Sequence, residues 1–181
     1  MTGGRRARDH QLLDALGTLE PEPFEGSVWR AVRDGRRPLE GSSARGRWSP
    51  GHFDVAYTSL EPDGARAEVY FHLSRQPVFP SRLRYWLYEL SVKTKETLRF
   101  ANIKALLELG IEEARYREVL YDRTQAIGDA AQFMGFDGLI VPSARWDCLN
   151  LVLFIDSVDL DEIDIEEKAA IDWEAWRDKA R

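Results

Sequence analysis

The pattern of apolar and polar positions predicts strands most clearly in three places. The short apolar runs at residues 138–141 and 149–154 predict two strands, joined by a loop that contains Ser143. Between residues 83 and 92, large apolar residues occupy odd and even positions alike, so both faces of that segment are apolar. This pattern is typical of a strand that is mostly buried in a sheet.

Two further strands are predicted nearer the N-terminus. Residues 27–32 and 55–59 are rich in residues that favour strands, and turn-forming residues lie close to them. The intervening segment, residues 33–50, holds three glycines, two prolines and three serines, so we expect a long loop. Loops of this length inside a compact domain are usually functional or mobile.

Helices are predicted where apolar residues recur at helical spacing. Pro62 suits the first turn of a helix, where its missing N–H costs nothing, and apolar residues follow it at intervals of four. Gly110 and Gly135 are expected to end the other two helices. The three predicted helices run from residue 62 to about 73, from 103 to 109 and from about 123 to 134.

The order of these elements predicts a single α+β domain, with a mixed or antiparallel sheet and flanking helices. We place the domain at residues 23–158. Residues 1–22 are expected to be a partly flexible leader, because they begin polar and rich in arginine. Residues 159–181 are expected to be an acidic C-terminal extension, in which Trp173 and Trp176 could seat a last helical turn.

Composition and charge exclude several classes of protein. A chain of 181 residues with 44% hydrophobic residues suits one packed domain. The net charge of −6 weighs against direct nucleic-acid binding, which generally needs a basic face. No segment approaches the roughly 20 apolar residues of a membrane span, and no signal peptide is expected. The lone Cys148 fits a reducing cytoplasm, and the three histidines lack the spacing of metal ligands, so no metal is expected.

Several short motifs occur together along the chain. Gly46-Arg47-Trp48 is followed closely by Ala56-Tyr57-Thr58-Ser59-Leu60; then come Ala67-Glu68-Val69 and, later, Gly138-Leu139-Ile140-Val141-Pro142-Ser143-Ala144. In this order they resemble the RES domain family over about residues 26–156. The resemblance implies a fold related to that of ADP-ribosyltransferases. It also implies the toxin half of a bacterial toxin–antitoxin pair, which consumes NAD.

Cleavage of the nicotinamide–ribose bond of NAD has simple chemical needs. Nicotinamide is already a cation, so no general acid is needed to expel it. Positive charge develops on the ribose, and a nearby carboxylate stabilises it. Arginines match the negative charges of the pyrophosphate, and an aromatic face holds the nicotinamide ring.

The resemblance implies that five residues fill these roles. Glu68, Arg47 and Ser143 are the predicted catalytic residues, and Arg30, Arg47, Tyr57 and Ser143 the predicted NAD-binding residues. Each residue also has an ordinary interpretation: a solvated glutamate, surface arginines, a core tyrosine and a turn serine. A further polar residue in the strand at 149–154, the asparagine at position 150, is left outside the predicted site.

The resemblance further implies partners and leaves alternatives open. NAD would be a substrate rather than a cofactor, and water, phosphate or a protein side chain could accept the ADP-ribosyl group. The alternatives are an ADP-ribosyltransferase that modifies a protein target, or a catalytically inactive module that binds NAD or ADP-ribose. The expected partner is a DNA-binding antitoxin of the Xre type, in a cytoplasmic complex built on a homodimer of this chain.

Overall fold

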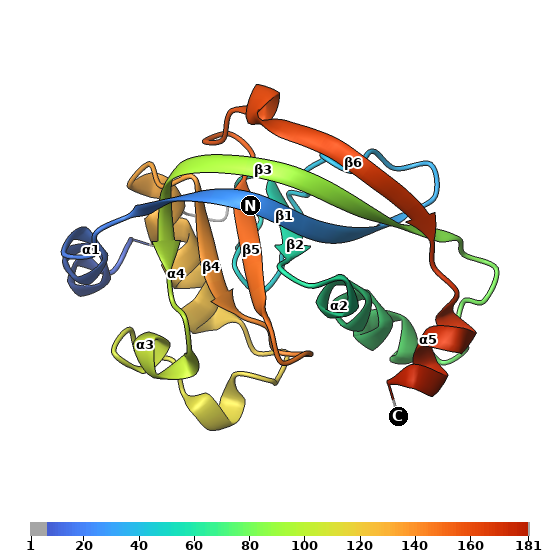
Figure 1. Cartoon of the computed structure of the whole chain (residues 1–181). Helices are drawn as coiled ribbons and strands as arrows, with labels where there is room; N and C mark the ends of the chain where they lie inside the picture. The colour runs from blue at the N-terminus through green and yellow to red at the C-terminus, as the bar shows by residue number, and fades with distance from the viewer. Residues whose placement is uncertain (1–6, 181) are drawn as a thin grey trace, which may run out of the picture.

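One mixed sheet organises the computed structural model, which describes residues 7–180 of the chain. Its six strands follow the order β1-β2-β5-β4-β3-β6, and helices flank them (Figure 1). The α+β class predicted from the sequence is therefore confirmed. The strands are β1 (Glu22–Arg33), β2 (Val55–Ser59), β3 (Tyr85–Arg99), β4 (Gly138–Pro142), β5 (Leu149–Phe154) and β6 (Ile163–Ala170); the helices are α1 (His10–Gly17), α2 (Pro62–Ser74), α3 (Ile103–Leu107), α4 (Asp122–Phe133) and α5 (Trp173–Lys179).

The two longest strands hold the sheet together. β1 and β3 pair antiparallel over most of their length, and the end of β3 continues parallel to β4. β1 also pairs with β2 through Trp29 and Ser59, so five strands close on themselves and β6 lies outside, against β3. In Figure 1, β1, β3 and β6 cross above β4 and β5.

Strands β4 and β5 separate two apolar cores, because both of their faces are buried. Ile140 and Leu151 face a core shared with β1 and β3. Leu139 and Val152 face the other core, which α1 and α4 cover. Burial on both faces explains why these strands appear in the sequence as continuous apolar runs.

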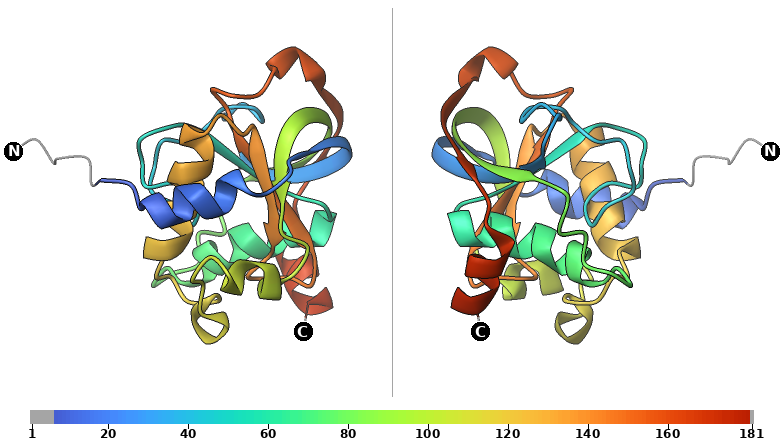
Figure 2. Two further views of the ribbon diagram at one scale, coloured as in Figure 1. Left: turned by 90° about the vertical axis from the view of Figure 1, so that its left-hand side faces the viewer. Right: turned by 90° about the vertical axis from the view of Figure 1, so that its right-hand side faces the viewer.

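Helix α1 belongs to the packed domain. The Asp9 side chain caps its start, and Leu12 and Leu16 are buried in the core that α4 also covers. Figure 2 shows α1 lying beside α4. The sequence assigned this helix to a partly flexible leader, but two buried leucines at helical spacing attach it to the domain. Residues 1–6 of the predicted leader, and Arg181, lie outside the described residues.

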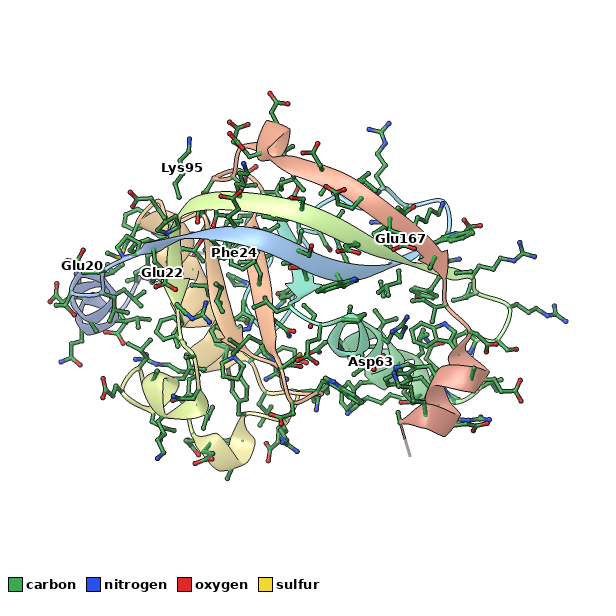
Figure 3. All side chains as sticks on the ribbon, viewed as in Figure 1. Glu20, Glu22, Phe24, Asp63, Lys95 and Glu167 are labelled. Carbon is green, nitrogen blue, oxygen red and sulfur yellow. The ribbon has the colours of Figure 1, made fainter. Side chains whose placement is uncertain are left out.

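The acidic C-terminal segment is also part of the fold. β6 pairs with β3, and Trp173 and Trp176 of α5 bury their rings against α2. Asp63, labelled at α2 in Figure 3, accepts hydrogen bonds from Trp176 Nε1 at 3.3 Å and Lys179 Nζ at 2.7 Å, so it links α2 to α5. The sequence placed residues 159–181 beyond the domain, because every β6 residue except Ile163 is exposed and an apolar pattern is missing.

Two of the predicted strands were correct in place but too short, whereas the strands predicted at 55–59 and 149–154 match β2 and β5. β1 begins at Glu22 rather than Ser27, and β3 continues to Arg99 rather than ending at Val92. The added parts are polar because one side of each faces solvent. Among the described residues, no helix is long and apolar enough to cross a membrane.

Gly128 of α4 lies directly against the backbone carbonyl of Trp48, so we predict that Gly128→Ala destabilises the domain. A Cβ there would overlap that carbonyl oxygen, which cannot rotate away. Overpacking of this kind costs about 1–3 kcal/mol, measurable by urea unfolding. Gly17→Ala is the matched control, because its Cβ would meet Met134 Cε at an ordinary 3.5 Å. Equal stability of the two variants would contradict the predicted packing.

Candidate active site

A cavity of about 350 Å³ opens where α2 crosses the sheet. The loop before β2 forms one wall, α2 forms another, and β2, β5 and the end of β4 form the floor. Among the described residues that line it, Glu68 is the one carboxylate, against four arginines. The charged and polar side chains of the lining include Arg30, Arg45, Arg47, Tyr57, Glu68, His72, Tyr121, Arg145 and Asn150.

Glu68 lies on α2 with its carboxylate held from the floor of the cavity. Its Oε1 accepts a hydrogen bond from Ser143 Oγ at 2.8 Å and another from Asn150 Nδ2 at 3.0 Å. The described residues offer no hydrogen bond to Oε2. One oxygen therefore fixes the orientation of the carboxylate, and the other can meet a ligand.

Ser143 supports Glu68 from behind. Its hydroxyl oxygen accepts hydrogen bonds from the backbone N–H groups of Arg145 and Trp146, at 3.1 and 3.2 Å. Its own proton is thereby directed to Glu68. The neighbours Pro142 and Ala144 line the cavity, whereas Ser143 acts on it through the carboxylate.

Arg47 lines the cavity, and the segment after α3 holds its side chain. Its guanidinium donates to the carbonyls of Tyr116 at 2.5 Å and Glu118 at 3.3 Å. The rings of Tyr116 and Tyr121 lie 5.2 and 4.8 Å from its Cζ. Backbone and aromatic contacts thus fix this cation without an acidic partner among the described residues.

Arg30 lines the cavity, but its guanidinium is used elsewhere. It donates to the carbonyls of Pro38 at 2.5 Å and Glu40 at 2.9 Å, which ties the long loop to β1. Burial lowers the pKa of Arg30 to about 10, so it stays charged at neutral pH. In this structure Arg30, which was predicted to bind phosphate, holds the long loop in place.

Tyr57 of β2 presents its ring to the cavity. Its hydroxyl accepts a hydrogen bond from the backbone N–H of Trp48 at 3.1 Å, and burial raises its pKa to about 12. The phenol is therefore neutral over the physiological range. An aromatic face held in this way is suited to stacking against a flat ring.

Comparison with known proteins identifies the family of the chain. Residues 27–178 match the family model of the RES domain. The chain belongs to the RES domain family. A chain in the crystal structure of the M. tuberculosis MbcT–MbcA toxin–antitoxin complex shares the fold, with a TM-score of 0.84 and 20% identity over 95% of this chain and 98% of that one. No curated protein matches the sequence.

The structure of this RES domain brings the five predicted residues to one cavity. Arg30, Arg47, Tyr57 and Glu68 line it, and Ser143 contacts Glu68 from beneath. The family motifs are far apart in sequence, and the pairing of β2 with β5 and of β5 with β4 places two of them, residues 56–60 and 138–144, on either side of β5.

Other residues of the cavity were not included in the sequence prediction. Asn150 is the single polar residue in the apolar strand at 149–154, and this break in the apolar pattern could have marked it as a candidate site residue. Arg145 follows the predicted serine by two positions, but nothing in its local pattern separates it from the many surface arginines. Gln125 is buried, and its amide contacts both Gly46 O and Arg45, which holds the loop of the first motif.

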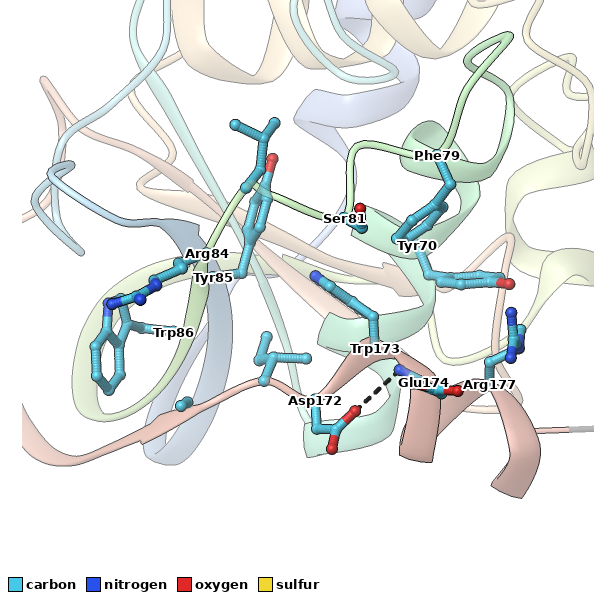
Figure 4. A pocket seen from close by; sticks show the side chains of 13 residues that line it. Tyr70, Phe79, Ser81, Arg84, Tyr85, Trp86, Asp172, Trp173, Glu174 and Arg177 are labelled. Atoms are coloured by element: carbon cyan, nitrogen blue, oxygen red, sulfur yellow. Dashed lines mark hydrogen bonds between the residues drawn. The ribbon is translucent and has the colours of Figure 1, made fainter.

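A larger cavity of about 660 Å³ lies between α2, β3 and α5 and is lined by aromatic rings (Figure 4). Trp173 Nε1 is buried beside it without a hydrogen-bond partner among the described residues. Its acidic lining residues, Asp172 and Glu174, belong to the start of α5, where Asp172 caps the helix. No group of three or more His, Cys, Asp or Glu residues in the described part of the chain could hold a metal ion.

The pKa of His72 reports on the charged side chains near it in the site. Burial is the largest cause of its lowered pKa; Glu68 raises this pKa and Arg145 lowers it. We predict an NMR titration midpoint below 6.5, which falls further in Glu68→Gln and rises in Arg145→Ala. Because the folded-state pKa lies below the unfolded value, the stability that His72 contributes is present above pH 6.5 and is lost as the pH falls. A midpoint at or above 6.5 would contradict the prediction.

Proposed function

We propose that this RES domain consumes NAD by cleaving its nicotinamide–ribose bond. The observation that carries the proposal is a single carboxylate, Glu68, oriented by Ser143 and Asn150 in a cavity whose other charged side chains are arginines. A carboxylate with one free oxygen suits a developing cation. Arginines suit an anionic ligand.

The proposed reaction breaks the bond between ribose C1′ and the ring nitrogen of nicotinamide. The bonding electron pair leaves with nicotinamide, which becomes neutral, and the ribose gains oxocarbenium character. Glu68 stabilises that charge through Oε2 while Oε1 stays bound to its two donors. The acceptor oxygen then bonds to C1′ and loses its proton to solvent. Water yields ADP-ribose, and phosphate yields its 1-phosphorylated form.

The remaining groups bind the two ends of the substrate. The ring of Tyr57 stacks on nicotinamide, and its hydroxyl, held by Trp48 N–H, keeps the ring in place. Arg47 lines the cavity and would bind the pyrophosphate. In this arrangement NAD is the substrate, and no metal or further cofactor takes part.

The decisive experiment incubates the purified chain with NAD, with and without phosphate, and measures free nicotinamide and the ribosyl product by chromatography. We expect nicotinamide release by the parent protein and a loss of about 10²–10³ in kcat for Glu68→Gln, since one preorganised electrostatic partner is removed. Glu61→Gln is the matched control, because Glu61 is exposed at the start of the same helix and lies outside the cavity lining.

Failure to release nicotinamide with either acceptor would contradict the enzymatic proposal. Saturable binding of NAD without turnover would instead identify an inactive binding module. The nature of the ribosyl product separates hydrolysis, phosphorolysis and transfer to a protein side chain.

The proposed biological role is that of a toxin held in check by a partner protein in the cytoplasm. The shared fold with a chain of a toxin–antitoxin complex supports this role. An enzyme that depletes NAD must be inhibited in the cell that makes it, and an Xre-type, DNA-binding antitoxin would cover the cavity. Because the cavity is rich in arginine, an acidic or carboxylate-bearing end of the antitoxin would fit it. A homodimer of the chain would form the centre of the complex.

Charge reversal at Arg47 tests whether NAD and the partner protein bind in the same cavity. We predict that Arg47→Glu lowers both NAD turnover and affinity for the product of the neighbouring gene, measured by co-purification and calorimetry. Arg82→Glu is the control, because Arg82 is exposed and lies outside the cavity lining. Lost turnover with unchanged partner affinity would separate the two surfaces and leave the enzymatic proposal standing.

A further inference from the structure

Arg145 and Arg47 both donate hydrogen bonds to backbone carbonyls of one three-residue segment, residues 116–118. Arg47 donates to the carbonyls of Tyr116 and Glu118, and Arg145 Nη1 donates to the intervening carbonyl of Arg117 at 2.7 Å. Both side chains line the cavity. The loop after α3 therefore holds two guanidinium groups at one side of the site.

The Arg145 guanidinium is held in place, but not all of its N–H donors have a hydrogen-bond partner. Its Cζ lies 3.3 Å from the centroid of the Phe71 ring, which fixes its plane. Its Nη2 is buried and has no hydrogen-bond partner among the described residues. The guanidinium has five N–H donors and gives one side-chain hydrogen bond among the described residues, to Arg117, so it keeps donors for an anion in the cavity that it lines.

The electrostatic balance at this point favours an anion. No carboxylate among the described residues forms an ion pair with Arg47 or Arg145, and nearby Arg47 contributes to lowering the pKa of the Arg145 guanidinium, after burial. Two cations held side by side repel each other, and a bound anion removes that repulsion. A phosphate group suits a guanidinium because two of its oxygens accept two parallel hydrogen bonds that the guanidinium donates.

We propose that Arg145 and Arg47 together form a subsite for the pyrophosphate of a dinucleotide. Arg145 takes the place that the sequence gave to Arg30, whose guanidinium is bound to the carbonyls of Pro38 and Glu40. This inference rests on the proposed function for the identity of the dinucleotide. The phosphate-binding chemistry stands on the two arginines alone.

The first test measures binding of inorganic pyrophosphate to the full chain by isothermal titration calorimetry. We expect binding by the parent, a loss of about tenfold or more in Arg145→Ala, and a smaller loss in Arg145→Lys, which keeps the charge but not the fork. Arg75→Ala is the matched control. Arg75 also lies over the Phe71 ring, at 5.2 Å, but is exposed and lies outside the cavity lining.

The outcomes separate this subsite from the enzymatic proposal. Pyrophosphate binding that depends on Arg145, in a chain that releases no nicotinamide, supports the subsite and contradicts the enzyme. Nicotinamide release with an unchanged KM for NAD and unchanged pyrophosphate affinity in Arg145→Ala overturns the subsite and leaves the enzyme. A parent protein that does not bind pyrophosphate at millimolar concentration also overturns it.

A second arm distinguishes the pyrophosphate of the substrate from free phosphate as the ligand. We expect Arg145→Ala to raise KM for NAD at least tenfold at zero phosphate, with a smaller change in kcat. If only the stimulation of turnover by phosphate is lost, the two arginines hold an acceptor phosphate and the pyrophosphate assignment is wrong. Circular dichroism of both Arg145 variants checks that the fold is retained.

Discussion

The Oε1 atom of Glu68 accepts hydrogen bonds from a side chain just after β4 and another at the start of β5, and the geometry of the whole cavity depends on this shared contact. β4 and β5 pair antiparallel and are largely buried on both faces, so Ser143 and Asn150 are positioned by two paired strands of the core. A single hydrogen bond would leave the carboxylate free to rotate. Two donors from paired strands fix its plane and leave Oε2 toward the cavity.

The two sides of the site differ: apolar strands form its floor, and the loops beside it carry the arginines. The floor is built from strands whose apolar faces fill both cores. Arg47 and Arg145 lie on two loops, before β2 and after β4, and backbone carbonyls and aromatic rings hold both side chains. The protein carries a net charge of −6, yet the cavity lining is rich in arginine. Local concentration of positive charge in an acidic protein directs an anionic ligand to one place, because the remaining surface repels it.

The sequence predicted those parts of the fold whose pattern reflects burial. The strands at 138–142 and 149–154 were found because both faces are apolar, and α4 because Gly135, at a φ of 89°, ends it. β6 was missed because an edge strand with one buried residue has no apolar pattern. Glu68 and Ser143 were found through the family motifs. Arg145 could not be, because its role depends on the carbonyl of Arg117, 28 residues away.

The segments at the two ends of the chain have a function in this arrangement despite their polar sequences. Helix α5 packs Trp173 and Trp176 against α2, and Asp63 near the start of α2 bonds Trp176 and Lys179. These contacts hold α2, and therefore Glu68, against the sheet from the side opposite the cavity. Helix α1 supports α4 in the same way, and Gly128 of α4 contacts the backbone next to Arg47. Each terminal helix thus packs against a helix next to the site: α5 against α2, which carries Glu68, and α1 against α4, which contacts the backbone beside Arg47.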